Sequence, residues 1–256
     1  MKQQVRCESV TRRLGGTARG AAGTPARRFR AAAVAALAVA LVTGCSVAGS
    51  GGGGSAEYGL RPGAAPSPSV TGASGLAAKA LDADSVAGAA VTTPRGADAL
   101  SPKDVRAEKG CAPLARALAG TTVGEPAAST SRRVSSGGQV TAVTLASYEN
   151  EDAVAAMTEL SAASDACTGG FAFTVRDEQV RVVREGKALS PAGADQSMAF
   201  TLTLAAGSST TGREVIALRS GTTICLLSAL DPTGSAAAGP ADIPTAVVEA
   251  QLAALA

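Results

Sequence analysis

The five cysteines are the side chains of this 256-residue sequence with the greatest scope for chemistry. A thiolate is a nucleophile and a metal ligand, and two thiols can form a disulfide. The sequence contains no histidine, so neither a Ser-His nor a Cys-His catalytic pair can form. The cysteines also lack the close spacing of metal sites, and we therefore expect no metal, no cofactor and no enzymatic activity. They are Cys7, Cys45, Cys111, Cys167 and Cys225.

Cys45 follows a segment typical of an export signal. Three arginines within residues 27–30 precede an uninterrupted apolar run over residues 31–42, and the small residues Thr43 and Gly44 come next. Twelve helical residues are about 18 Å long, whereas the hydrocarbon core of a bilayer is about 30 Å thick. The run is therefore too short for a stable transmembrane helix, and we predict a signal peptide over residues 1–44.

The segment Val42-Thr43-Gly44-Cys45 resembles the lipobox of bacterial lipoproteins. The resemblance implies that the Cys45 thiol receives a diacylglyceryl group and that Cys45 becomes the first residue of the mature chain. Two acyl chains hold a protein stably at a bilayer. The expected localisation is the cell membrane, by a lipid anchor on its extracytoplasmic face. The alternative is an ordinary secretory signal in which Cys45 has no lipid.

Residues 45–75 comprise the lipid anchor and a linker rich in Gly, Ser, Pro and Ala, including four consecutive glycines at 51–54. The linker has too little apolar surface to offset the entropy of ordering, so we predict a disordered tether. From residue 45 onward the chain has fifteen Lys and Arg residues and twenty Asp and Glu residues, a net charge of −5. This balance, without a cluster of cations, argues against nucleic acid as a partner.

Residues 76–256 show the pattern of one α+β domain, with an antiparallel sheet covered by two or three helices. A Gly137-Gly138 pair predicts a hairpin turn, and alternating apolar residues over 197–205 predict a half-buried strand. Residues 94–110 are polar and contain two prolines, so they are predicted as a loop. Strands are expected at 131–135, 139–148, 171–176, 179–184, 197–205, 213–219 and 222–230, and helices at 76–83, 111–119, 151–167 and 244–255.

The helix over residues 151–167 has the clearest boundaries, because Asn150 is a good N-cap and Gly169-Gly170 would terminate it. Its apolar face is expected to contain five residues. The helix and the C-terminal helix are expected to cover one face of the sheet. A turn is predicted at residues 231–234. The expected apolar face of the helix over residues 151–167 consists of Val154, Met157, Leu160, Ser164 and Cys167.

Three cysteines remain in the mature domain, in a compartment that permits disulfides. Cys111 begins one predicted helix and Cys167 ends another, both facing packed surface. Cys225 lies in the middle of a strand, where a free cysteine commonly serves as a small buried hydrophobic residue. We predict a Cys111–Cys167 disulfide with Cys225 reduced and buried. The alternative is that no bridge forms and all three thiols are packing residues.

Two further groups are candidates for chemistry. Asp177-Glu178 is an acidic pair between strands, but a turn favours polar residues in any case. Arg132-Arg133 beside Ser131 could bind an anion, although a solvated strand edge explains the pair more simply. The serines have no base partner and no Gly-x-Ser-x-Gly motif.

The order of features resembles actinobacterial lipoproteins related to the PknH-type extracellular sensor domain of receptor kinases. The resemblance rests on Cys111-Ala112-Pro113-Leu114, on Cys167-Thr168-Gly169-Gly170 and on the strand at 215–221, and it covers residues 76–256. It implies a non-enzymatic sensing or ligand-binding domain outside the membrane, with an unidentified small ligand or envelope protein as partner. The sensor domain of the kinase is expected to hold paired disulfides. The three cysteines that remain in this domain are an odd number and depart from that pattern. The alternative function is a structural or partner-binding envelope lipoprotein without a small-molecule ligand.

Overall fold

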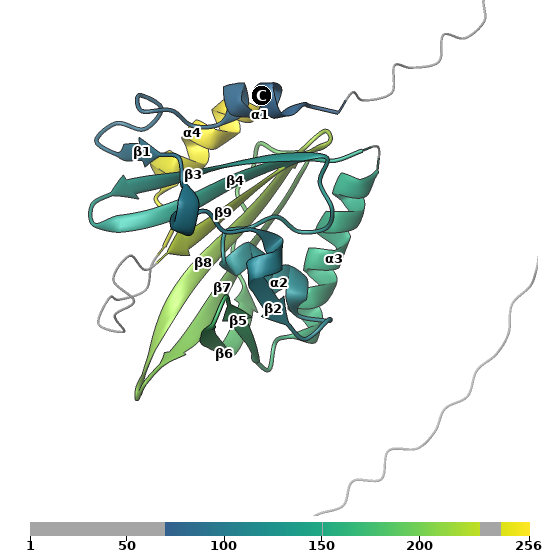
Figure 1. Cartoon of the computed structure of the whole chain (residues 1–256), viewed down its shortest axis with the longest axis vertical. Coiled ribbons are helices and arrows are strands. Elements are labelled where there is room, and N and C mark those ends of the chain that lie inside the picture. The colour runs from purple at the N-terminus through teal and green to yellow at the C-terminus, as the bar shows by residue number, and fades with distance from the viewer. Residues whose placement is uncertain (1–69, 150, 231–241) are drawn as a thin grey trace, which may run out of the picture. The chain divides into compact units, whose positions relative to one another are not determined.

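A computed structural model describes residues 70–149, 151–230 and 242–256, and these residues form nine strands, four α-helices and two 3-10 turns (Figure 1). The strands are β1 (Ala90–Thr92), β2 (Val105–Ala107), β3 (Ala128–Ser136), β4 (Gln139–Ser147), β5 (Phe171–Val175), β6 (Glu178–Lys187), β7 (Gln196–Ala206), β8 (Ser209–Ser220) and β9 (Thr223–Leu230). The helices are α1 (Ala73–Lys79), α2 (Ala112–Leu118), α3 (Asp152–Ala166) and α4 (Thr245–Leu255), and the 3-10 turns are η1 (Gly96–Asp98) and η2 (Pro102–Asp104).

All nine strands belong to one antiparallel sheet with the order β1-β3-β4-β9-β8-β7-β6-β5-β2. The predicted fold class, a single α+β domain with an antiparallel sheet, is therefore confirmed. The hairpin between β3 and β4 turns at Gly137 and Gly138, both of which have positive φ angles (57° and 80°). Glycine adopts this left-handed conformation without steric cost, which explains why the sequence signalled a turn here.

The interior strand β9 has buried apolar residues on both faces. Ile224 and Leu226 belong to one buried cluster, whereas Cys225 and Leu227 belong to a second cluster on the opposite face of the sheet. Successive side chains of a strand point to opposite faces, so an uninterrupted buried run requires cover on both sides. The sheet therefore separates two hydrophobic cores.

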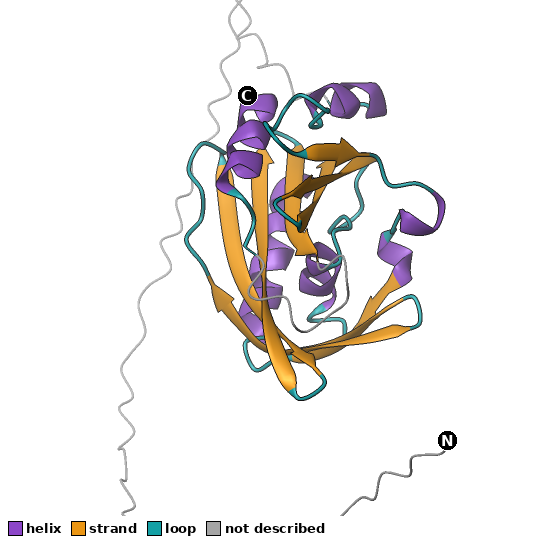
Figure 2. Ribbon diagram, turned by 90° about the vertical axis from the view of Figure 1, so that its left-hand side faces the viewer, coloured by secondary structure: helices purple, strands orange, loops and turns teal. Residues whose placement is uncertain are grey.

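Helices cover both faces of the sheet, and the expectation that α3 and α4 share one face is wrong. Met157 and Leu160 of α3 pack into the first cluster together with α2, whereas Val247 and Val248 of α4 pack into the second together with α1. Figure 2 shows helices on both sides of the strands. The apolar runs of β8 and β9 explain the arrangement, because a helix on one side alone would leave the other face exposed to water.

The face of α3 that packs against the sheet differs from the predicted one. Met157, Leu160, Ser164 and Cys167 are buried as expected, but Val154 is 45% exposed. Small residues take its place in the core, where they allow the helix to approach its neighbours closely. The predicted N-cap Asn150 and the predicted turn at 231–234 lie outside the described residues. The buried small residues are Ala153, Ala156 and Ala163.

Two short edge strands were missed by the sequence analysis. β1 lies at one edge of the sheet and β2 at the other, although only residues 93–104 separate them in sequence. β2 lies within the segment predicted as a loop, since three residues give too short a pattern to recognise. The segment with η1 and η2 therefore runs from one edge of the sheet to the other.

The N-terminal boundary of the domain also differs from the prediction. Helix α1 begins at Ala73 rather than at residue 76, and Leu76 is fully buried. The predicted signal peptide, Cys45 and linker residues 45–69 lie outside the described residues. Within the described part of the chain, no helix is both long and apolar enough to cross a bilayer.

Candidate functional site

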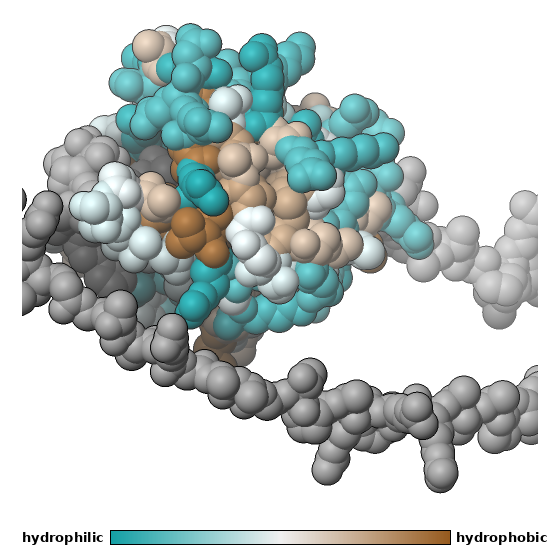
Figure 3. All heavy atoms as spheres, turned by 90° about the horizontal axis from the view of Figure 1, so that it is seen from below, coloured by the Kyte–Doolittle hydropathy of each residue, from teal (hydrophilic) through white to brown (hydrophobic). Residues whose placement is uncertain are grey.

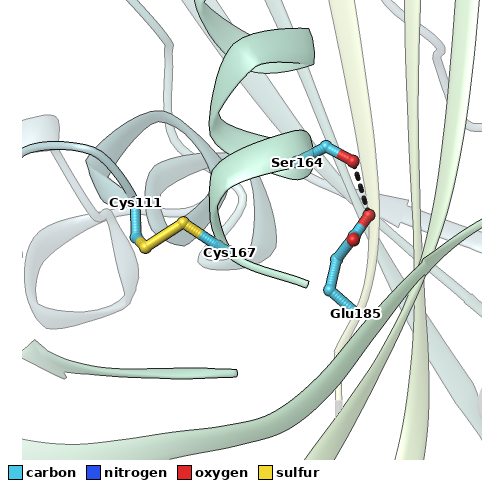
Figure 4. Close-up of a disulfide and its surroundings, with 4 residues drawn as sticks. All are labelled: Cys111, Ser164, Cys167 and Glu185. Atoms are coloured by element: carbon cyan, nitrogen blue, oxygen red, sulfur yellow. Dashed lines mark hydrogen bonds between the residues drawn. A yellow bond between two sulfur atoms is a disulfide. The ribbon is translucent and has the colours of Figure 1, made fainter. Parts of the chain in front are cut away.

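A disulfide joins Cys111 and Cys167, whose Cα atoms are 6.0 Å apart (Figure 4). Cys111 is the N-cap of α2 and Cys167 is the C-cap of α3, so the bridge ties the start of one helix to the end of the other. Cys225 is free and fully buried. Burial raises the pKa of its thiol far above the ordinary value, which keeps the thiol protonated and unreactive at neutral pH. The predicted pairing is confirmed.

A buried polar contact lies beside the disulfide. Ser164 of α3 donates a 2.6 Å hydrogen bond to Oε1 of Glu185, whose residue is 6% exposed (Figure 4). One residue further along α3 and two further along β6, Lys187 donates to Asp165 at 2.7 Å. Ser164 is fully buried, so no substrate can reach its hydroxyl. We interpret these contacts as attaching the last turn of α3 to β6.

The acidic pair Asp177-Glu178 lies at the turn between β5 and β6, and both residues are exposed. Arg176, just before them, has a φ angle of 55°, so the turn is formed by a left-handed non-glycine residue. Among the described residues, no group of three or more Cys, Asp or Glu side chains is arranged to hold a metal ion.

The arginine pair divides between the two sides of β3. Arg132 donates to the carbonyl of Leu81, beyond helix α1, and to the hydroxyl of Thr130. Arg133 donates instead to the carbonyl of Asp98 at 3.0 Å and lies 3.8 Å from the Asp98 carboxylate. In the antiparallel pairing of β3 with β1, Arg133 lies opposite Thr92. The interpretation of this position as a solvated strand edge is therefore wrong.

Arg133 and Ser131 border a pocket of about 190 Å³ between β3, β4, the residues after α2 and the segment that carries η1. Five of its lining residues have hydroxyl side chains. The pocket is smaller than a typical cofactor site, which measures about 300–1,000 Å³, so only a small ligand fits. The lining residues are Thr93, Pro94, Asp98, Ala99, Leu100, Ala119, Gly120, Ser129, Thr130, Ser131, Arg132, Arg133, Ala142 and Thr144.

A chain of hydrogen bonds fixes the polarity of one pocket wall. Thr144 donates to the Gly120 carbonyl at 2.7 Å, and its oxygen lies 2.9 Å from the Ser131 oxygen. Because a carbonyl can only accept, the proton of Thr144 is committed to Gly120, and Ser131 must donate to Thr144. The Ser131 hydroxyl therefore has only acceptor capacity left for a ligand.

Gly120 brings the end of α2 close to the sheet. Its φ angle is 72°, and a Cβ atom at this position would lie 2.7 Å from the Cβ of Ala142. Only glycine combines the left-handed conformation with this close approach.

One part of the pocket could be predicted from the sequence. The pairing of Ser131 with Thr144 follows from counting outward from the Gly137-Gly138 turn. The contribution of Gly120 and Asp98 to the pocket depends on tertiary packing.

The pocket offers donors at one end and acceptors along one wall. Arg133 uses one N–H donor for the Asp98 carbonyl, and its side chain is 33% exposed, so further N–H groups remain for an anion. Ser131 supplies acceptor capacity on the same wall. This arrangement fits a small molecule with a carboxylate or similar anionic group and a hydroxyl or amine.

Two other hollows differ in character. One of about 430 Å³ is bordered by Glu125, Asp152 and Glu159 together with Arg116, so its charge is mainly negative. Another, of about 290 Å³, lies between the Gly169-Gly170 segment and the β5–β6 hairpin and has Phe171, Val182 and Val183 in its walls. Seen from below, apolar residues form part of the molecular surface and are bordered by polar residues (Figure 3). The larger hollow also contains Tyr148 in its lining, but this residue is fully buried and its hydroxyl donates to the Val123 carbonyl. The smaller hollow has Arg181 but no side-chain hydroxyl group in its walls.

The described residues define a class of protein domain: an α+β domain with one antiparallel sheet, helices on both faces and one disulfide. No protein-family model matches the chain, and no curated protein sequence matches it. Among solved structures, the chain is similar to the extracellular domain of PknH from Mycobacterium tuberculosis, with 12% sequence identity and a TM-score of 0.47. The match covers 73% of this chain and 96% of that chain.

Proposed function

We propose that the protein is a non-enzymatic lipoprotein, anchored through Cys45 on the extracytoplasmic face of the cell membrane, whose domain binds a small ligand. The observation that carries the proposal is the Cys111–Cys167 disulfide. Disulfides persist outside the reducing cytosol. This agrees with a chain whose N-terminal segment has the basic, apolar and small-residue order of an export signal ending at Cys45.

The ligand in this proposal is a small anion with a hydrogen-bond donor. Arg133 would bind the anionic group, and the Ser131 oxygen would accept from a hydroxyl or amine of the same molecule. A sensing role suits this arrangement, because the pocket walls come from β3, β4 and the segment 93–104, which ligand contacts would hold together. The proton of Ser131 is directed to Thr144, so the serine has no base to activate it.

Replacing Cys45 by alanine is expected to release the protein from the membrane. The wild-type chain and Cys45→Ala are expressed in an actinobacterial host, and membrane and medium fractions are compared by immunoblotting. We expect the wild type in the membrane fraction and the variant mainly outside it, because two acyl chains bind stably whereas the unmodified chain has no anchor. Cys7→Ala is the matched control and should fractionate like the wild type. Equal release of wild type and Cys45→Ala would contradict the anchor.

Replacing Arg133 by glutamine is expected to weaken anion binding about 10- to 100-fold, since a hydrogen bond to a charged group contributes about 1.5–3 kcal/mol. Acetate and sulfate are titrated at constant ionic strength into residues 46–256, and amide shifts of Ser131 and Arg133 are followed by NMR. Arg95→Gln removes an exposed cation that does not line the pocket and is the control. If neither anion shifts these amides, or if both variants bind alike, the pocket assignment is wrong.

A structural or partner-binding envelope lipoprotein is the second candidate. The observation in its favour is the uncovered outer face of β2, β5 and β6, where exposed polar side chains alternate with residues of the first buried cluster. The anion titration separates the two candidates, since this second function requires no ligand in the pocket.

A further inference from the structure

The sheet has one face that no described helix covers at the β2 end. Helices α1 and α4 pack on the second cluster, whose strand residues come from β3, β4, β7, β8 and β9. None of the buried residues in that cluster belongs to β2, β5 or β6. The outward side chains of these three strands therefore have no helix packed over them among the described residues.

Three arginines lie on this uncovered face. Arg106 of β2 stands between Val105 and Ala107, and both neighbours face the first cluster on the other side of the sheet. Arg181 of β6 likewise stands between Val180 and Val182. Because side chains alternate along a strand, both arginines must point outward, and both are exposed.

A β-bulge adds the third arginine. The register of β6 against β7 shifts between Val182 and Arg184, so Val182 pairs with Leu204 and Arg184 pairs with Thr203. This extra residue lets Val182 and Glu185 both face inward although they are three positions apart. Val183 and Arg184 are consequently directed outward, where Val183 is 39% exposed and Arg184 is exposed.

The register places these cations close together. Arg106 pairs with Thr174 and Arg181 pairs with Ala172, so the two arginines are two strands and two residues apart. Strand spacings of about 4.8 Å and rises of about 3.4 Å per residue give a Cα separation of about 12 Å. Among the described residues, no ion pair involves Arg106, Arg181 or Arg184.

Within the strands, carboxylates are scarce on this side of the sheet, whereas Asp104 and Glu108 flank β2 just outside its two ends. Among the described residues of the neighbouring strands β2, β5, β6, β7 and β8, the only acidic residue that lies on this side by register is Glu214, opposite Thr201. Its Oε2 accepts a hydrogen bond from the backbone amide of Ile243. The chain from Cys45 onward has a net charge of −5, so a locally cationic face runs against its average. Charge complementarity therefore points to an anionic partner surface.

We propose that the outer face of β2, β5 and β6 binds the anionic phospholipid headgroups of the membrane that holds the protein. The proposal rests on the proposed lipid anchor, which places that surface within reach. The roughly 27 residues between Cys45 and α1 correspond to an r.m.s. span of about 30 Å for a Gly-rich chain. Arg106, Arg181 and Arg184 provide the charge, and Val183 adds an apolar contact between them.

The expected effect is a loss of vesicle binding when the three charges are removed. Each basic residue near an anionic membrane contributes about a five-fold increase in affinity, so Arg106→Gln, Arg181→Gln and Arg184→Gln together should weaken binding about 100-fold. Arg95→Gln, Lys103→Gln and Lys109→Gln remove three exposed cations outside the strands and form the matched control. The control should lose less than about five-fold.

The test uses residues 46–256, which contain the compact unit Arg61–Ala256 and lack both the apolar run and Cys45. Folding of each variant is checked by its circular dichroism and by whether its one free thiol, at the buried Cys225, stays protected from thiol reagents. Binding is measured by co-sedimentation with vesicles of phosphatidylglycerol and phosphatidylcholine, and with phosphatidylcholine alone, at two salt concentrations. Because the fragment has no lipid, the result is independent of the Cys45→Ala fractionation.

Binding to the anionic vesicles only, reduced by salt and by the strand variant but not by the control, supports the proposal. Millimolar inorganic phosphate should leave this binding unchanged, because Arg106 and Arg181 are about 12 Å apart and a single small ion cannot bridge them. Absence of binding to anionic vesicles overturns the proposal, as does an equal loss in both triple variants. Binding to polyglutamate but not to vesicles also overturns it, since the face would then fit an acidic polymer.

Discussion

Replacing Cys111 and Cys167 together by alanine is expected to lower the free energy of unfolding by about 4 kcal/mol. The two residues are 56 positions apart, and their bridge restricts a correspondingly long loop of the unfolded chain. The chain-entropy account of cross-links gives this value for such a loop. Urea denaturation of residues 46–256, followed by circular dichroism, measures the difference between the variant and the oxidised wild type.

Reduction provides the internal control for the disulfide. Dithiothreitol should destabilise the wild type by a similar amount and leave the double variant unchanged, because Cys225 is fully buried and has no partner to release. Thiol titration in denaturant without reductant should find one free thiol in the wild-type fragment. Three free thiols, or a disulfide peptide that contains Cys225, would contradict the pairing.

Replacing Leu226 or Leu227 by alanine is expected to cost about 2–5 kcal/mol in each case. Both side chains are almost completely buried, but they belong to different clusters on the two faces of β9. Each truncation leaves a cavity that its own core must partly fill. The free energy of unfolding is measured by urea denaturation, with Leu189→Ala as the control because Leu189 is 96% exposed and should change stability by less than about 0.5 kcal/mol.

The positions of perturbed methyl groups test the two-core arrangement directly. Leu226→Ala should shift NMR resonances on the α2 and α3 side, including Met157 and Leu160. Leu227→Ala should shift those on the α1 and α4 side, including Val247 and Val248. If both variants perturb the same side, the assignment of the helices to opposite faces is wrong.

Local signals in the sequence determined most of the elements. The Gly137-Gly138 turn fixed the β3–β4 hairpin, because only glycine adopts both of its left-handed conformations at low cost. Pro113 in the first turn of α2 and the glycines after α3 marked helix boundaries in the same way. The pairing of Cys111 with Cys167 was also predictable, since both cysteines lie at helix ends and Cys225 lies in an apolar strand.

Only the tertiary structure decided which face each element covers. The sequence shows a continuous apolar run in β9, from Ile224 to Leu227, but it does not say which helix packs on which side. Helices α3 and α4 lie on opposite faces. Val154 shows the same limit of periodicity, because alanines rather than the larger valine occupy the buried side of α3. Packing between distant elements, rather than hydrophobicity alone, selects these faces.

The pocket and the arginine face depend on the same long-range arrangement. Ser131 and Thr144 are paired by a local hairpin, yet the pocket also needs Asp98 and Gly120 from segments that only the folded sheet brings alongside. Arg106, Arg181 and Arg184 are scattered in sequence and share a face because β2 joins the edge beside β5 and because β6 contains a bulge. Local sequence determines backbone conformation, whereas strand order and register determine which side chains meet.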